Sequence, residues 1–196
     1  DTLDAGDRVD TFLRALQDVP GLDDAVVLPF QRAVGDELIG AVEDPRVAVD
    51  VALRALRQRR WNVGGGGGTG GARGAPASGD LHDAGGPGLA AARRAVEAAA
   101  VSTARIPLAV RGRDEEAAAE AEAVLRLVGQ LVWSRTDAEW AVLDLLVPGV
   151  RGQQKPAAAA LGITAQAVSQ AVQRSYWNEE HACRPAAARL LTLAGG

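Results

Sequence analysis

The sequence predicts a mixed fold, with helices and strands in its first half and helices alone in its second half. Residues 25–42 contain two β-branched runs around Gly35-Asp36, a pattern typical of a β-hairpin. Residues 113–196 instead show helical spacing of apolar side chains and alanine-rich runs. We therefore expect an α/β domain over residues 1–112, followed by an all-α domain.

The hairpin is expected to lie between two amphipathic helices. One is predicted over residues 7–18 and ends before Pro20-Gly21, and the other covers residues 45–60. Pro29 falls within the first hairpin strand and indicates an edge position or an irregular start, because proline donates no backbone hydrogen bond. The apolar face of the first helix comprises Val9, Phe12, Leu13 and Leu16.

A glycine-rich segment follows Trp61-Asn62-Val63, which resembles the start of a strand. We interpret residues 64–88 as a flexible linker or surface loop, because glycine, alanine, proline, aspartate and serine dominate their composition. A phosphate-binding loop is the alternative. The absence of a following Gly-Lys-Ser/Thr, and of any lysine before position 155, argues against an NTPase P-loop.

The remaining elements follow from local patterns. Residues 88–101 and 114–133 predict helices, and residues 103–110 predict a short strand that Pro107 interrupts. Thr136 and Glu139 have the spacing of a helix N-terminal capping box. A last helix is expected to begin near Pro185.

Residues 153–175 have the spacing of a helix-turn-helix motif. Ala158 is small where the second helix would cross, and Gly162 permits the positive φ that reverses the chain between the helices. Thr164 is placed to cap the second helix. The inner faces are expected to bury Leu161, Ile163, Val168 and Val172.

The outward side chains of the second helix are short or carry amides, which suit hydrogen bonds to base edges in a major groove. An ordinary helical hairpin without a ligand, or a scaffold for protein–protein contact, are the alternatives. For DNA binding, Arg174 and Lys155 would contact phosphates. The residues expected to face bases are Thr164, Gln166, Ser169, Gln170 and Gln173.

The formal net charge of −4 excludes a protein that coats nucleic acid through its overall charge. A modest phosphate-facing patch is expected near the motif, and weak binding per subunit would favour a homodimer on paired half-sites. Positive charge in this region comes from Arg151, Lys155, Arg174, Arg184 and Arg189, opposed by Glu179 and Glu180.

The single cysteine, Cys183, excludes an internal disulfide. No apolar run is long enough to span a bilayer and no signal segment opens the chain, so we expect a cytoplasmic protein without membrane partners. The chain begins with Asp1 and contains no methionine, from which we expect that its N-terminus was processed or that residues before it are missing. No cofactor is expected.

The adjacent acids Asp36 and Glu37 stand at the predicted hairpin tip. Acidic residues at a turn are usually solvated, because aspartate tolerates the backbone conformation there. The alternative is a metal or nucleotide site, since magnesium binds carboxylates together with substrate phosphates. Such a site would need a second carboxylate from a neighbouring strand. No such strand is visible before residue 25, unless residues missing from the front of the chain supply it.

Taken in order, these features resemble the SatD family of bacterial proteins. The resemblance implies a ferredoxin-like or nucleotidyl-cyclase-like α/β domain before the helix-turn-helix domain. The family begins with a strand that carries a Gly-Asp…Ser-Arg motif, and this strand is absent here. The stretches that carry the resemblance are Asp7-Arg8, Val34-Gly35-Asp36-Glu37-Leu38, Trp61-Asn62-Val63-Gly64, Gly86-Pro87-Gly88-Leu89-Ala90-Ala91-Ala92-Arg93 and residues 153–175.

The family hairpin also resembles the Gly-Gly-Asp-Glu-Phe turn of diguanylate cyclases. Val34 replaces the first glycine of that turn and Leu38 replaces its phenylalanine, so the resemblance favours the fold over the activity. The sequence thus predicts a DNA-binding transcriptional regulator rather than an enzyme, with a small molecule or nucleotide as effector. The alternative is a metal-dependent nucleotide-binding or cyclase-like enzyme centred on Asp36 and Glu37.

Overall fold

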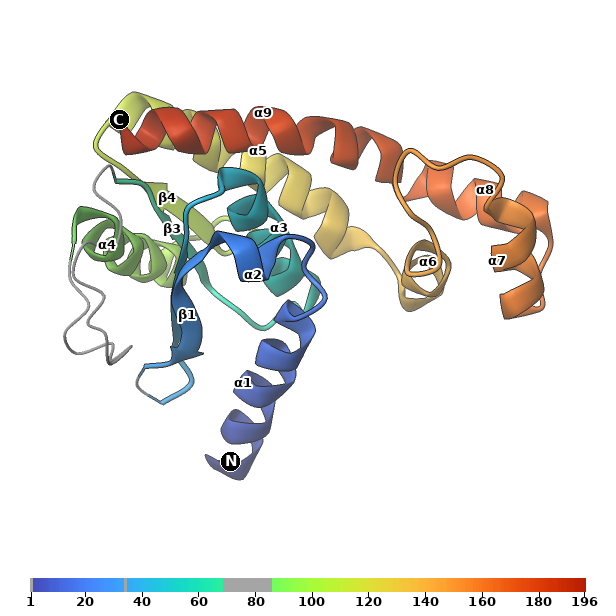
Figure 1. Ribbon diagram of the computed structural model, residues 1–196, viewed down its shortest axis with the longest axis horizontal. Helices are drawn as coiled ribbons and strands as arrows, with labels where there is room; N and C mark the ends of the chain where they lie inside the picture. Colours follow the sequence, from blue (N-terminus) through green and yellow to red (C-terminus); the bar gives the residue numbers. More distant parts are fainter. Residues whose placement is uncertain (1, 34, 69–85) are drawn as a thin grey trace.

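A computed structural model describes residues 2–33, 35–68 and 86–196 of the chain. The structure is mixed α+β, as the sequence predicts. Figure 1 shows two parts, which we call the body and the lobe. The lobe consists of α6 (Asp137–Leu143), α7 (Gln154–Leu161) and α8 (Ala165–Arg174), and the last helix, α9 (Trp177–Gly195), runs from the lobe along the body.

The predicted hairpin is confirmed. After α1 (Thr2–Leu16) and α2 (Leu22–Ala25), strands β1 (Val26–Arg32) and β2 (Leu38–Val42) pair antiparallel. The register shifts on both sides of Leu28, and the second shift spans Pro29, which cannot donate to the ladder. Val9, Phe12 and Leu16 of α1 are buried. The first helix therefore packs as its periodicity predicts, although it begins before residue 7.

The interpretation of residues 64–88 as a loop is wrong for Gly64–Gly66. Strand β3 (Val63–Gly66) pairs in parallel with β4 (Leu108–Arg111), and α4 (Pro87–Val101) packs directly on β3. A Cβ atom at Gly64 would lie 2.4 Å from the backbone nitrogen of Val96, and one at Gly66 would lie 2.1 Å from the carbonyl oxygen of Gly88. These glycines thus permit a close approach of helix and strand backbones. The rest of the predicted loop from 69 to 85 lies outside the described residues.

The expected domain border at residue 112 does not separate two cores. Helix α3 (Pro45–Arg57) and strand β4 share a buried cluster with α5 (Glu115–Ser134) and α9. The body therefore includes α5 and much of α9, and the chain leaves it at Arg135. Members of this core include Leu53, Leu56, Val110, Leu125, Val128, Ala187 and Ala188.

Helix α9 begins at Trp177 rather than near Pro185, which lies inside it. Trp177 and Glu180 are buried and fix the first turn, so the helix starts ahead of the proline. Other predicted elements are confirmed: α4, α5 and the capping box of α6, in which Thr136 and Glu139 cap each other's backbone N–H groups. None of the helices described here is long and apolar enough to cross a membrane.

We predict that Gly64→Ala lowers the free energy of unfolding by about 2–3 kcal/mol, because the new methyl group would press on the α4 backbone. Gly65→Ala is the matched control, since its Cβ would lie 3.6 Å from a Val110 methyl carbon, an ordinary contact. Urea denaturation of both variants measures the difference. Equal stability of the two variants would contradict the close packing of α4 on β3.

Candidate nucleic-acid interface

The turn between α7 and α8 is formed by the residues that the sequence singles out. Gly162 adopts a φ of 65°, and the N–H of Ile163 donates to the carbonyl of Ala158 at 3.0 Å, which closes the end of α7. The Thr164 hydroxyl accepts from the N–H of Ala167 at 3.1 Å and caps α8. The predicted helix–turn–helix geometry is therefore present in the lobe.

The lobe has a small core of its own, and one inner-face prediction is wrong. Ile163 is 41% exposed rather than buried. The space between the helices is filled instead by Val142 of α6 and by Leu146, with Leu161 partly buried beside them. Val168 is fully buried, as predicted, and Val172 partly so. The buried members of this core are Val142, Ala157, Ala158, Val168 and Ala171.

The amide side chains of α8 lie on its outer face. Gln166, Gln170 and Gln173 are exposed, and within the described residues none of them hydrogen-bonds to another part of the chain. Thr164 and Ser169 are also exposed, but the Thr164 hydroxyl caps α8 and the Ser169 hydroxyl donates to the carbonyl of Ala165 at 3.1 Å. The three glutamines are thus the side chains most available to an external partner.

The predicted phosphate contacts divide into two groups. Lys155, Arg151 and Arg174 are exposed, and Arg174 stays 68% exposed although its Nε lies 4.0 Å from a Glu139 oxygen. Arg184, which the sequence counts toward the same patch, turns inward. It donates to Glu180 at 2.5 Å and to Asp50 of α3 at 2.7 Å. The basic patch near the motif is therefore smaller than predicted.

A buried arginine that the sequence analysis does not identify holds the C-terminal end of α8. Arg135, only 1% exposed, donates from Nε and Nη2 to the carbonyl of Ser175 at 3.2 and 3.1 Å, and from Nη2 to Glu180 at 3.2 Å. Burial lowers the pKa of Arg135, and the charge of Glu180 opposes that shift. Arg135 and Glu180 are 45 residues apart, so no local pattern indicates the pair.

The acidic pair at the hairpin tip stands apart from this surface. Gly35 has a φ of 60°, and the N–H of Ala33 donates to the carbonyl of Glu37 at 2.9 Å, which closes the turn. Asp36 is exposed and Glu37 partly so. Over the described residues, no three histidine, cysteine, aspartate or glutamate side chains are grouped as a metal site would require. In the part of the chain that the structure describes, no third carboxylate joins this pair.

Comparison of the chain with protein-family models, with curated proteins and with solved structures gave no match. Function is therefore argued from the geometry of the lobe and from the chemistry of its exposed face. The two features that matter are the exposed glutamines of α8 and the capped, anchored ends of that helix.

We predict that His181 makes the protein less stable as the pH falls below about 6.5. Its Nδ1 lies 2.8 Å from the carbonyl of Trp177 and 3.2 Å from Glu180. Burial, then the charge of Arg184, lower its pKa from 6.5, although Glu180 opposes them. The pKa of His181 is therefore lower in the folded protein than in the unfolded chain, so the unfolded chain binds the proton first as the pH falls. Stability that is present above the unfolded pKa is lost as the pH falls below it.

Urea unfolding at pH 7.5 and at pH 5.5 measures how much stability the protein loses as the pH falls. The same measurement on the His181→Gln variant is the comparison. The variant should lose less stability than the parent between the two pH values, because glutamine does not titrate. An identical loss in both proteins would show that His181 does not contribute.

Proposed function

We propose that this chain is a sequence-specific DNA-binding protein, a transcriptional regulator whose helix α8 enters the major groove. The observation that carries the proposal is the row of exposed, unbonded amides of Gln166, Gln170 and Gln173 on one helix. Glutamine amides pair with adenine through two hydrogen bonds in the major groove. Because α8 is capped at one end and anchored at the other, its backbone loses little conformational freedom when it presents these amides to DNA.

The exposed charges near the motif support contacts to the DNA backbone. Lys155 at the start of α7, Arg151 before it and Arg174 at the end of α8 are exposed and would bind phosphates that border the groove. Three contacts of this kind give weak binding per subunit. We therefore propose a homodimer that binds two half-sites one or more helical turns apart.

We further propose that the body is a ferredoxin-like sensing domain, as the resemblance to the SatD family implies, and that the protein acts in the cytoplasm. The described strands form two separate pairs. Leu89 of α4 packs against Leu28 of β1 and Ile39 of β2, while α4 also covers β3 and β4. One helix that contacts both pairs supports their belonging to a single layer.

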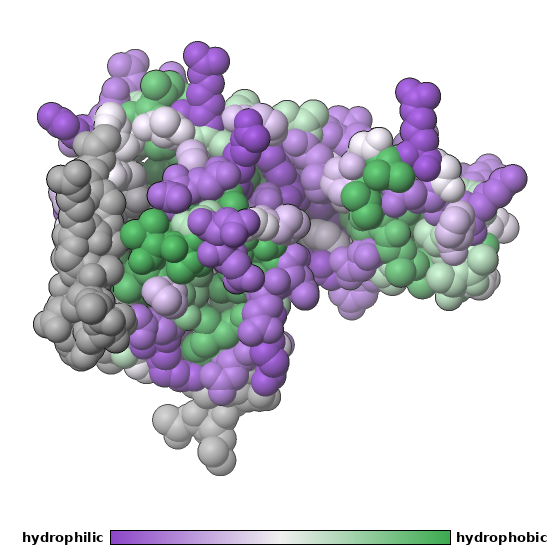
Figure 2. Space-filling view, in the orientation of Figure 1, coloured by the Kyte–Doolittle hydropathy of each residue, from purple (hydrophilic) through white to green (hydrophobic). Residues whose placement is uncertain are grey.

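A scaffold for protein–protein contact is a second candidate, favoured by exposed apolar side chains around the lobe. Figure 2 shows apolar surface gathered there, and Leu145, Val147, Val150 and Ile163 are 45%, 58%, 55% and 41% exposed. The enzyme alternative centred on Asp36 and Glu37 stays a hypothesis. Magnesium-dependent binding of a labelled purine triphosphate, abolished by Asp36→Asn, would support it.

We predict that replacing Gln166, Gln170 and Gln173 together by alanine abolishes specific binding to the promoter region of the protein's own gene. The cost should be at least about 2 kcal/mol, or thirtyfold in affinity, because base-specific pairs are lost. Electrophoretic mobility shifts measure it, and circular dichroism verifies folding. Alanine also favours helix, so the variant should remain folded.

Gln17→Ala is the control, because Gln17 is an exposed amide in the body. It should bind DNA like the parent. Retention of specific binding by the triple variant would rule out α8 as the reading helix.

We also predict that Lys155→Ala and Arg174→Ala each reduce the salt dependence of DNA binding by about one unit in the slope of log affinity against log salt concentration. Each removes one exposed cation close to the proposed groove. Fluorescence anisotropy at several salt concentrations measures the slopes, with Arg46→Ala, an exposed cation of the body, as the control. An affinity independent of salt in the parent protein would favour the scaffold function.

A further inference from the structure

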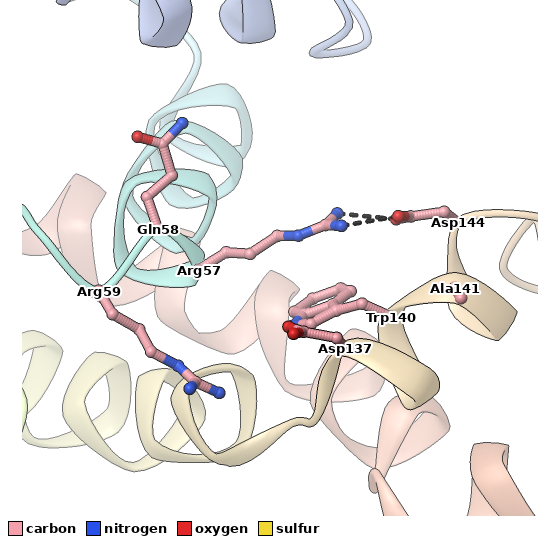
Figure 3. Close-up of a pocket in the computed structure, with 7 residues that line it drawn as sticks. All are labelled: Arg57, Gln58, Arg59, Asp137, Trp140, Ala141 and Asp144. Atoms are coloured by element: carbon pink, nitrogen blue, oxygen red, sulfur yellow. Dashed lines mark hydrogen bonds and ion pairs between the residues drawn. The ribbon is translucent and has the colours of Figure 1, made fainter. Parts of the chain in front are cut away.

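A polar cleft lies between the body and the lobe, where the C-terminal end of α3 faces α6 (Figure 3). Its volume is about 460 Å³, which lies in the range of small-molecule sites. One wall carries Arg57, Gln58 and Arg59, and the other carries Asp137, Trp140, Ala141 and Asp144. One wall thus carries two guanidinium groups and the other carries two carboxylates, so the charges of the lining sum to zero.

Arg57 and Asp144 already pair with each other across the cleft. The guanidinium donates to both carboxylate oxygens at 2.7 and 2.6 Å and lies 3.9 Å from the centre of the Trp140 ring. Figure 3 shows this bridge and the indole below it. The side chains are 34% and 49% exposed, so water screens the pair. Trp140 belongs to α6 and Asp144 is the residue that caps its C-terminal end, so the bridge links the body to the lobe.

Arg59 and Asp137 are the other charged groups of the cleft. Arg59 follows the end of α3 with a φ of 55°, a left-handed conformation that usually belongs to glycine at this position. Its guanidinium donates to the carbonyl of Arg135, and its remaining N–H groups are available to a ligand. The Asp137 carboxylate has no hydrogen bond or ion pair among the described residues. A strained arginine and an unpaired carboxylate therefore line one cleft.

We propose that this cleft binds a small zwitterion of the α-amino acid class. The Arg59 guanidinium would take its carboxylate, for which the planar fork of arginine is suited, and the Asp137 carboxylate would take its ammonium group. A purely anionic ligand would meet repulsion from the aspartate wall, and a purely cationic one from the arginine wall.

The site would be an effector site, an assignment that rests on the proposed DNA-binding function. Helix α6, which carries Asp137 and Trp140 and ends just before Asp144, packs through Val142 against Val168 of α8. A ligand in the cleft would compete for Arg57, Asp144 and Trp140, whose contacts link the lobe to the body. Binding would therefore change how the lobe, which contains α8, is attached to the body. DNA affinity is then expected to change by at least about fivefold when the ligand binds.

Isothermal titration calorimetry without DNA tests the ligand site, using the full chain and each standard amino acid singly. At least one amino acid should bind saturably, and acetate and methylammonium alone should bind at least about tenfold more weakly. No saturable heat with any amino acid would overturn the proposal. Equal binding of acetate would overturn the zwitterion assignment.

The variants Arg59→Gln and Asp137→Asn should each weaken this binding at least about tenfold. Arg60→Gln is the matched control, since it removes the same charge one residue away and Arg60 does not line the cleft. Circular dichroism verifies folding. Binding of parental strength in both cleft variants would overturn the location.

The effector role is measured separately, by mobility shift with and without the amino acid. A parent protein that binds both DNA and the amino acid, but whose DNA affinity does not change, would overturn the coupling. A protein that binds the amino acid but no DNA would overturn the proposed function and leave the ligand site standing.

Discussion

The buried contact of Arg135 with Glu180 and with the carbonyl of Ser175 is the constraint on which the placement of α8 depends. Both side chains are almost fully buried, at 1% and 0% exposure. A buried charge without its partner is strongly destabilising, whereas the pair itself adds little net stability. The contact therefore acts mainly by geometry, because it fixes where α8 ends relative to α9 and the body.

Arg184 extends this constraint from the lobe to the body. It pairs with Glu180 within α9 and with Asp50 of α3, so one chain of charged groups joins α3, α9 and the residue that ends α8. The guanidinium of Arg135 also lies 4.9 Å from the centre of the Trp140 ring, and that of Arg57 lies 3.9 Å from it. Trp140 thus lies between Arg135, which positions α8, and Arg57, which lines the cleft.

Local patterns predicted the elements that depend on local chemistry. The hairpin, the capping box at Thr136 and the reversal at Gly162 follow from residue types within a few positions of each other. The strand at Gly64–Gly66 was missed because glycine has no strand preference, and only the backbone of α4 explains it. The inward turn of Arg184 depends on Asp50, 134 residues away, which no local pattern indicates.

Local patterns are equally unable to predict how the chain divides into domains. The all-helical composition after residue 112 suggested a separate domain, but composition does not indicate which helices share a core. Helix α5 packs on β4 and α3, and the body therefore extends well beyond the expected border. Of the proposed site, the exposed glutamines were predictable from helical spacing, whereas the anchoring by Arg135 was not.

The most direct test of the account is to select bound fragments from the genomic DNA of the source organism with the full chain. A short recurrent motif, repeated at a spacing of one or more helical turns, is the result expected of paired reading helices. Recovery of fragments without any shared motif would contradict the claim that α8 reads DNA sequence.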